Sequence, residues 1–394
     1  MNRRERLMAT LRGESVDRVP VCFYEINGLD EDPLDPSPLN VYSDPSWKPV
    51  LDLAREKTDR IVMRSIPFGP AESDETPHGG PWTALDVVPD FLPGRRKKEN
   101  WVDDKGSWFE RVTLSGNGRD LTCLTRRDPD MNTIWTVEPL LKSAEDLAAL
   151  LDFPPAAPKP VPDISGVLEA ESRLDDSGIV MIDTFDPLCV PLLLLHMDQF
   201  VLTAVLHKEL FHRFLEFCSN HLASRVEAIS RALPGRLWRI YGPEAATPPM
   251  LSPTLFSEFV VRYDRPLIEI VQQHGGYARV HAHGRMKDVL DQIAATGCDG
   301  LDPIEPPPQG DVTLSHVRRS YGQQMVLFGN LEIVDIEALP PKEFRKKIAT
   351  ALDEGTAGPG RGFVLMPSAS PYGRTISART VRNYELMVEM VEKG

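Results

Sequence analysis

The chain has 394 residues, 41% of them hydrophobic and 26% charged, and its formal net charge is −14. This composition is that of an ordinary globular protein and excludes a disordered, collagen-like or disulfide-stapled chain. An acidic surface repels phosphate backbones and anionic lipids, so we expect no nucleic acid and no membrane as partners. The five cysteines form no C-x-x-C pair, and no stretch reaches the roughly 18 apolar residues of a membrane span. We therefore expect a cytoplasmic protein.

Short apolar runs alternate along the chain with amphipathic segments. This alternation is typical of parallel β-strands that are joined by helices. One helix is expected from Ser252-Pro253 to about residue 273, and another over residues 285–295, each ended by glycine. Eight such strands fit either a closed barrel or an open doubly wound sheet. The predicted strands are residues 19–24, 59–65, 178–184, 236–242, 277–283, 298–304, 324–330 and 362–368.

Residues 80–140 depart from the alternation. They are rich in Trp, Thr and Val, and they contain the turn sequences Asp-Lys-Gly and Gly-Asn-Gly, which favours antiparallel hairpins. We expect a β-rich insertion after the second strand, lying over the barrel mouth. The Pro-rich stretch 153–164 then leads back into the barrel, so that residues 1–394 form a single domain; the alternative is a linker between two domains.

Functional residues of an α/β barrel lie just after its strands. In this chain the positions after the predicted strands hold many polar side chains. Among the residues at or near the ends of these strands, we expect the substrate to be bound by Tyr24, Glu25, Asn27, Tyr241, Asn330, Ser368 and Ser370. The other polar residues at these positions are Asp183, Thr184, Asp186, Glu244, His281, His283, Asp302, Glu305 and Glu332.

The sharpest signal is His281-Ala282-His283 at the end of the fifth predicted strand. Residues at i and i+2 of a strand project to the same side, and neutral imidazole is a good zinc ligand. The alternative is a hydrogen-bonded pair that lines the barrel. Glu244, directly after the fourth strand, can add a carboxylate oxygen to complete a metal site, or it can be a helix cap or a surface residue.

Asp302 and Glu305 lie on a loop stiffened by prolines, which suits carboxylates held in place for acid–base chemistry. The alternative is a rigid loop that only caps the barrel. The sequence contains no G-x-S-x-G elbow, no phosphate-binding P-loop and no convincing G-x-G-x-x-G after a first strand. Hydrolase, P-loop and Rossmann interpretations therefore have no support.

Several ordered motifs resemble the uroporphyrinogen decarboxylase superfamily, which includes cobalamin-linked methyltransferases. The motifs lie in residues 3–21, 280–284, 297–300, 328–331 and 362–367, and the resemblance covers most of the chain outside 80–140. It implies a closed (β/α)₈ TIM barrel, and it also suggests a homodimer.

Two departures argue against porphyrinogen decarboxylation. Those decarboxylases carry arginines after the first strand to hold a poly-carboxylate, whereas this chain has Glu25 and the acidic run 30–32. Anionic side chains there repel such a substrate. The decarboxylases also place a histidine in the last strand's turn, where this chain has Ser368-Ala369-Ser370.

The methyltransferase branch of the superfamily holds zinc with H-x-C and a later cysteine. His281 matches the first ligand, His283 stands in the first cysteine position, and Ala369 replaces the last ligand, so that Glu244 or Glu305 would complete the site. The resemblance thus implies a zinc-dependent methyltransferase that polarises an ether or alcohol oxygen, as in O-demethylation. The methyl group would pass to a corrinoid carried by a partner protein, which would dock partly on the 80–140 insertion.

For this reaction we expect Glu305 or Asp302 to protonate the leaving oxygen, with Asp183 as a further catalytic carboxylate. One alternative is a decarboxylase or lyase that acts on a small carboxylate without metal and uses His281 and His283 as acid and base. Another alternative is a barrel that binds a ligand without catalysis.

Overall fold

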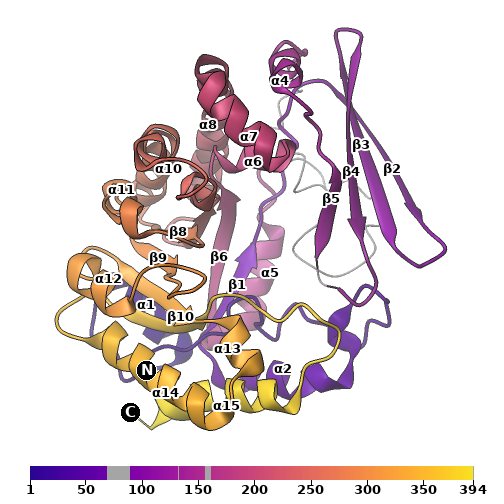
Figure 1. Cartoon of the computed structure of the whole chain (residues 1–394). Helices are drawn as coiled ribbons and strands as arrows, with labels where there is room; N and C mark the ends of the chain where they lie inside the picture. Colours follow the sequence, from indigo (N-terminus) through magenta and orange to yellow (C-terminus); the bar gives the residue numbers. More distant parts are fainter. Residues whose placement is uncertain (69–88, 132, 156–160, 394) are drawn as a thin grey trace.

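The computed structural model describes residues 1–68, 89–131, 133–155 and 161–393 (Figure 1). Within these ranges, parallel strands form a curled seven-stranded sheet in the order β1-β6-β7-β8-β9-β10-β11, with helices outside it. Seven of the eight predicted strands are therefore confirmed. They are β1 (Arg60–Arg64), β6 (Gly178–Phe185), β7 (Leu237–Tyr241), β8 (Tyr277–Ala282), β9 (Gly300–Pro303), β10 (Val326–Leu331) and β11 (Phe363–Pro367).

The first predicted strand, residues 19–24, is reduced to a short closing segment. Cys22 N donates to Leu365 O (3.1 Å), and Leu365 N donates to Pro20 O (2.9 Å). On its other side, Asp59 N donates to Val21 O (2.7 Å). This segment joins β11 to the start of β1, so the predicted (β/α)₈ barrel is confirmed.

The closing segment is short for two reasons. Pro20 has no N–H to donate to a strand ladder. Tyr24 has φ 54°, in the left-handed region, which turns the chain out of the extended conformation.

Helices follow most strands and cover the outside of the barrel (Figure 1). Ser252 caps the predicted helix through Leu255 N, and the helix runs through a π-helical turn into α10. None of the helices in the described ranges is long and apolar enough to cross a membrane. The longer helices are α1 (Arg3–Arg12), α2 (Lys48–Lys57), α5 (Ser165–Leu174), α7 (Met197–Leu206), α8 (Lys208–Ala232), α10 (Arg262–Gln273), α14 (Pro341–Thr356) and α15 (Ala378–Glu392). The shorter ones are α4 (Ala144–Leu151), α6 (Cys189–Leu194), α9 (Pro253–Phe256), α11 (Leu290–Ala295), α12 (Leu314–Tyr321) and α13 (Ile333–Ala338).

Alternate residues of each strand point into the barrel, and their polarity changes along its axis. Near the amino ends of the strands the inward side chains are apolar, and Leu7 and Leu11 of α1 pack against them. Further along β6, β7 and β8, the same side of the strand carries Asp183, Arg239, Arg279 and His281. The apolar inner cluster comprises Leu7, Leu11, Cys22, Tyr24, Ile61, Ile179, Met181, Leu237, Val326, Phe328, Val364 and Met366.

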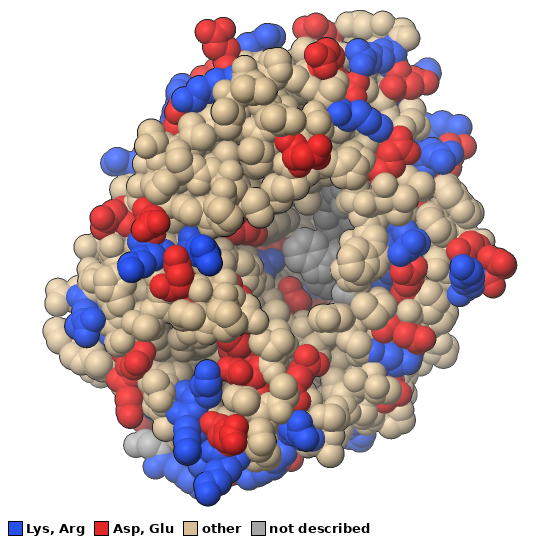
Figure 2. Space-filling view, viewed as in Figure 1, with Lys and Arg blue, Asp and Glu red and all other residues tan. Residues whose placement is uncertain are grey.

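The predicted hairpins form a separate four-stranded antiparallel sheet of β2 (Arg95–Val102), β3 (Trp108–Gly116), β4 (Arg119–Arg127) and β5 (Ile134–Glu138). Residues 80–88 and 132 of the predicted insertion lie outside the described ranges. Met131, after β4, pairs with Gly373 in the loop after β11. The sheet stands beside the barrel in Figure 1, and Figure 2 shows a hollow between the two.

Candidate active site

His281 and His283 lie at the carboxyl end of β8, on the same side of the strand, as their spacing predicts. Their ring centroids are 4.6 Å apart, and the ring planes are nearly perpendicular. The two side chains differ in exposure: 7% for His281 and 36% for His283. A substrate at the barrel mouth can therefore reach His283 but not most of His281.

Both ring nitrogens of His281 face protein partners. Nδ1 lies 2.7 Å from Asp302 Oδ2, and Nε2 lies 3.4 Å from the hydroxyl of Tyr24. The Tyr24 oxygen already accepts a hydrogen bond from Arg239 Nη1 (2.6 Å). Its own proton is then free to point at Nε2, which leaves Nδ1–H to donate to Asp302.

Asp302 is an ionised orienting group. Arg279 Nε lies 2.9 Å from its Oδ1, and both side chains are at most 2% exposed. Burial raises the pKa of Asp302, but Arg279 and His281 outweigh it, so the net pKa is lowered. Asp302 therefore accepts hydrogen bonds and is poorly suited to donate a proton.

Asp183 is bound in a second buried ion pair, with Arg239 on the neighbouring strand. Nε and Nη2 of Arg239 lie 2.6 and 3.0 Å from the two oxygens of Asp183. Burial lowers the pKa of Arg239, but the charge of Asp183 and the other raising contributions outweigh burial, so the net pKa is raised. Arg239 also lies over the ring of Tyr241, 5.2 Å from its centroid.

Arg239 and Arg279 are not among the predicted site residues. A signal was present, because each arginine interrupts an apolar strand two residues before a predicted site residue, Tyr241 or His281. A charged side chain in such a position must point into the barrel and find a partner there.

His283 forms a charge pair with Glu305. Its Nδ1 lies 2.9 Å from Glu305 Oε1, and Gly284 N donates to Oε2 (2.7 Å). Burial lowers the pKa of His283, but the hydrogen bond and charge of Glu305 outweigh it, so the net pKa is raised. Burial raises the pKa of Glu305, and the bond to His283 makes the net pKa lower than usual. The contact thus favours the imidazolium form of His283 and the carboxylate form of Glu305.

Glu332, after β10, is an additional carboxyl group near this pair. Its Oε2 accepts a hydrogen bond from Ser368 Oγ (3.1 Å), and its Oε1 is buried without a partner. Burial, followed by the charge of Glu305, raises the pKa of Glu332 to about 7. Ser368 therefore supports Glu332, and Ser370 donates to Glu25 Oε2 (3.1 Å).

Two other predicted residues contribute in different ways. The side-chain oxygen of Asn27 accepts from Leu29 N (2.8 Å), so this residue shapes its own loop. Asn330 lies half-buried on β10, at the end that faces the mouth.

A three-ligand zinc site does not fit this arrangement. Glu244 Oε2 accepts from Gly242 N (3.2 Å), within its own turn. No three His, Cys, Asp or Glu side chains of the described ranges are grouped so that they can hold a metal ion. Both nitrogens of His281 have partners, and His283 Nδ1 is bound to Glu305, whereas a zinc site needs free imidazole nitrogens and usually three protein ligands. We therefore derive no step through zinc.

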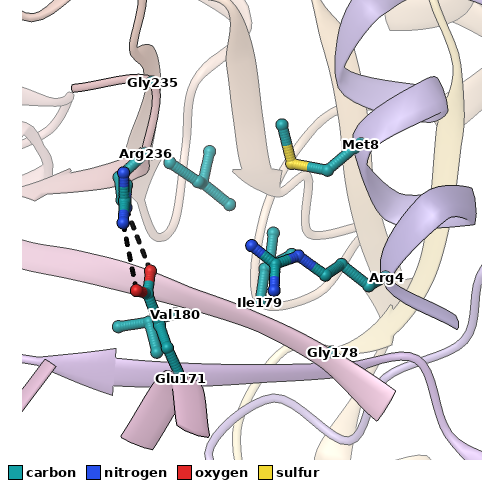
Figure 3. A pocket seen from close by; sticks show the side chains of 9 residues that line it. Arg4, Met8, Glu171, Gly178, Ile179, Val180, Gly235 and Arg236 are labelled. Carbon is teal, nitrogen blue, oxygen red and sulfur yellow. Dashed lines mark hydrogen bonds and ion pairs between the residues drawn. The ribbon is translucent and has the colours of Figure 1, made fainter. Parts of the chain in front are cut away.

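A pocket lies at the opposite, amino end of the barrel strands (Figure 3). Arg236 spans one of its walls, with two 3.0 Å hydrogen bonds to Glu171. None of the predicted site residues lines this pocket, and this end of an α/β barrel serves stability. Its lining comprises Arg4, Met8, Glu171, Gly178, Ile179, Val180, Gly235, Arg236 and Leu237.

The sequence model of uroporphyrinogen decarboxylase (URO-D) matches residues 137–393, more than half of the chain. The chain belongs to the uroporphyrinogen decarboxylase family. This family match begins at the end of β5 and includes every barrel strand from β6 onward. No curated protein matches the chain.

Among solved structures, this family member is similar to a methyltransferase from Methanosarcina mazei, with 18% identity, 99% of both chains covered and a TM-score of 0.59. That likeness shows a shared fold. A D-psicose 3-epimerase from Clostridium cellulolyticum H10 has 9% identity, with 59% of this chain and 93% of that chain covered and a TM-score of 0.31.

Proposed function

We propose that this member of the uroporphyrinogen decarboxylase family is a methyltransferase that demethylates a methoxylated compound or methanol. The observation that carries the proposal is the His283–Glu305 pair at the barrel mouth. Cleaving a methyl–oxygen bond leaves a basic oxygen that needs a proton, and a reachable imidazolium is a suitable donor. The methyl acceptor would be a reduced corrinoid carried by a partner protein, which supplies the nucleophile.

Charge at the site argues against a poly-carboxylate substrate. Arg239 and Arg279 are already paired with Asp183 and Asp302. Glu25, Glu305 and Glu332 add further acidic groups at the mouth. Among the site residues that are described, no unpaired arginine or lysine remains to bind substrate carboxylates, so a neutral donor fits better.

In the proposed reaction, His283 Nε2–H points away from Glu305 and protonates the donor oxygen. The carbon–oxygen bond breaks, the methyl group goes to the acceptor, and the oxygen leaves as a hydroxyl that carries the proton from His283. Glu305 stabilises the imidazolium before the transfer and keeps Nδ1 protonated after it, and solvent then returns a proton to Nε2. This role replaces our expectation that Glu305 or Asp302 gives the proton.

His281 is buried next to His283 and is held in one orientation by its partners. Its tautomer is set by Asp302 on one side and by Tyr24 on the other, and its ring meets His283 edge to face. Because the His281 ring cannot rotate, it restricts His283 to one orientation. Such positioning of a proton donor supplies much of the rate enhancement of an enzyme. The 80–140 insertion, which reaches the loop after β11 through Met131, remains our candidate for docking the corrinoid protein.

The test is methyl transfer to free cob(I)alamin, with 2-methoxyphenol and methanol as donors and methylcobalamin absorbance as the readout. We expect transfer by the wild type and a loss of about 100-fold or more in His283→Gln. His196→Gln, an exposed histidine at the start of α7, is the matched control and should not differ from wild type. Carbon dioxide release from small carboxylates, without methyl transfer from either donor, would instead establish the metal-free decarboxylase alternative.

A further inference from the structure

Two buried carboxyl groups behind the site leave three of their four oxygens without a hydrogen-bond partner. Asp186, in the loop after β6, and Asp264, on α10, are both completely shielded from solvent. Both oxygens of Asp264 and Oδ2 of Asp186 are buried without a hydrogen-bond partner. The fourth oxygen, Asp186 Oδ1, accepts from Cys189 N (2.5 Å).

No positive charge compensates these groups. Neither aspartate forms an ion pair within the described ranges, and the charges that act on Asp186 are those of Asp264 and Glu244. Burial, and then the charge of Asp186, raises the pKa of the Cys218 thiol on α8. An ionised carboxylate that is buried without a partner is very costly, and this cost applies to each of the two groups. Burial and then the charge of Asp264 raise the pKa of Asp186, and burial raises that of Asp264.

Asp186 is in direct contact with the turn that carries Glu244. Its backbone N–H donates to Tyr241 O (2.8 Å). A Cβ placed on Gly242 would lie 2.3 Å from Asp186 Oδ1 and 2.5 Å from Cys189 Cβ, so the glycine backbone packs directly against both side chains. Gly242 N in turn donates to Glu244.

We infer that Asp186 and Asp264 are both uncharged at neutral pH, and that the neutral Asp186 side chain holds the turn of residues 242–244 in place at the rim of the site. Tight packing against Gly242 favours a proton over a metal ion. So does the lack, in the described ranges, of any group of three His, Cys, Asp or Glu side chains that could hold a metal ion. The inference does not depend on the proposed methyl transfer.

The first test is thermal unfolding of the wild type and Asp264→Asn between pH 6 and pH 9. Because the folded-state pKa values lie above the unfolded value, the protonated pair stabilises fully below the unfolded pKa, and this stability is lost as pH rises through the folded pKa. We expect the wild-type Tm to fall by roughly 3 °C or more over this range. Asp264→Asn, which cannot lose the proton, should fall by less than half as much.

Asp353→Asn, an exposed aspartate on α14, is the matched control and should follow the wild type. Infrared spectroscopy gives a second readout that does not need equal stability: a protonated carboxyl band at pH 7, lost in both Asp264→Asn and Asp186→Asn. Equal pH slopes for wild type and Asp264→Asn, with no protonated carboxyl band, would overturn the inference.

The position of the turn can be followed through Cys189, which is buried against Gly242. At pH 9, alkylation located by peptide mapping should reach Cys189 about tenfold faster in the wild type than in Asp186→Asn. Equal rates in the two proteins would show that proton loss does not release the turn, and would overturn that part of the inference.

Discussion

His281 Nδ1 lies 2.7 Å from Asp302 Oδ2, and this buried contact fixes the histidine that supports the proton donor. Asp302→Asn keeps the shape but removes the acceptor that selects the Nδ1–H tautomer. We expect the methyl transfer rate to fall by about 10- to 100-fold, the usual effect of removing such an orienting partner. The rate is measured with the cob(I)alamin assay.

The same substitution leaves Arg279 buried without its counter-charge, so unfolding should become easier by about 3–5 kcal/mol. Urea unfolding measures this loss separately from the rate. A variant that unfolds as easily as wild type, with an unchanged rate, would contradict both roles of Asp302.

The Arg239–Asp183 pair allows a sharper separation of folding from catalysis. Arg239→Met leaves Asp183 buried without its counter-charge and should destabilise the protein by about 3–5 kcal/mol. Adding Asp183→Leu removes this unpaired carboxylate and should restore most of that stability. The double variant still lacks the guanidinium that orients the Tyr24 hydroxyl, so its activity should stay low. Recovery of the rate together with the stability would assign this pair to folding alone.

The activity should depend on pH through His283 and Glu305. The folded pKa of His283 is raised, so the proton donor is charged at low pH and is lost as pH rises through that value. The folded pKa of Glu305 is lowered, so its contribution is present at neutral pH and is lost only in acid. We expect a bell-shaped profile of kcat/KM.

Glu305→Gln removes the charge that raises the pKa of His283, so the alkaline limb of this profile should move down by about one pH unit. Glu209→Gln, an exposed residue on α8, serves as the control. An alkaline limb that stays in place in Glu305→Gln would show that another group carries the proton.

Metal content separates our proposal from the zinc hypothesis. Elemental analysis of the purified protein should show no stoichiometric zinc, and methyl transfer should survive chelation, because the described site residues offer no third ligand. About one zinc per chain, lost in His281→Ala/His283→Ala, would overturn the assignment of His283 as proton donor and support zinc activation of the donor oxygen.

The fold was predictable because its signals are local and repeated. Apolar runs of strand length, separated by capped helices, located seven strands to within a few residues. The run 19–24 has the composition of a strand, but its pairing depends on Pro20 and on the turn at Tyr24, and hydrophobicity does not report either effect. The turn sequences around residues 105 and 117 correctly predicted the hairpins.

The site was only partly predictable, because side-chain pairing across the barrel is not visible in spacing. The pattern His281-Ala282-His283 correctly placed two imidazoles together. It did not reveal that Asp302 and Glu305 bind their Nδ1 atoms, because the partners come from another strand and its loop. The apolar content of β7 and β8 predicts two buried strands, but it does not predict that Arg239 and Arg279 pair with carboxylates inside the barrel.

The closing segment ties the order of assembly to the site. Pro20 and Cys22 find their hydrogen-bond partners on Leu365, more than three hundred positions later in the chain. Tyr24 can therefore pack against His281 only after β11 has been synthesised and has joined the sheet. Helices and hairpins can form while the chain is still growing, but the barrel mouth is complete only at the end, so a chain that stops short of β11 would lack its active centre.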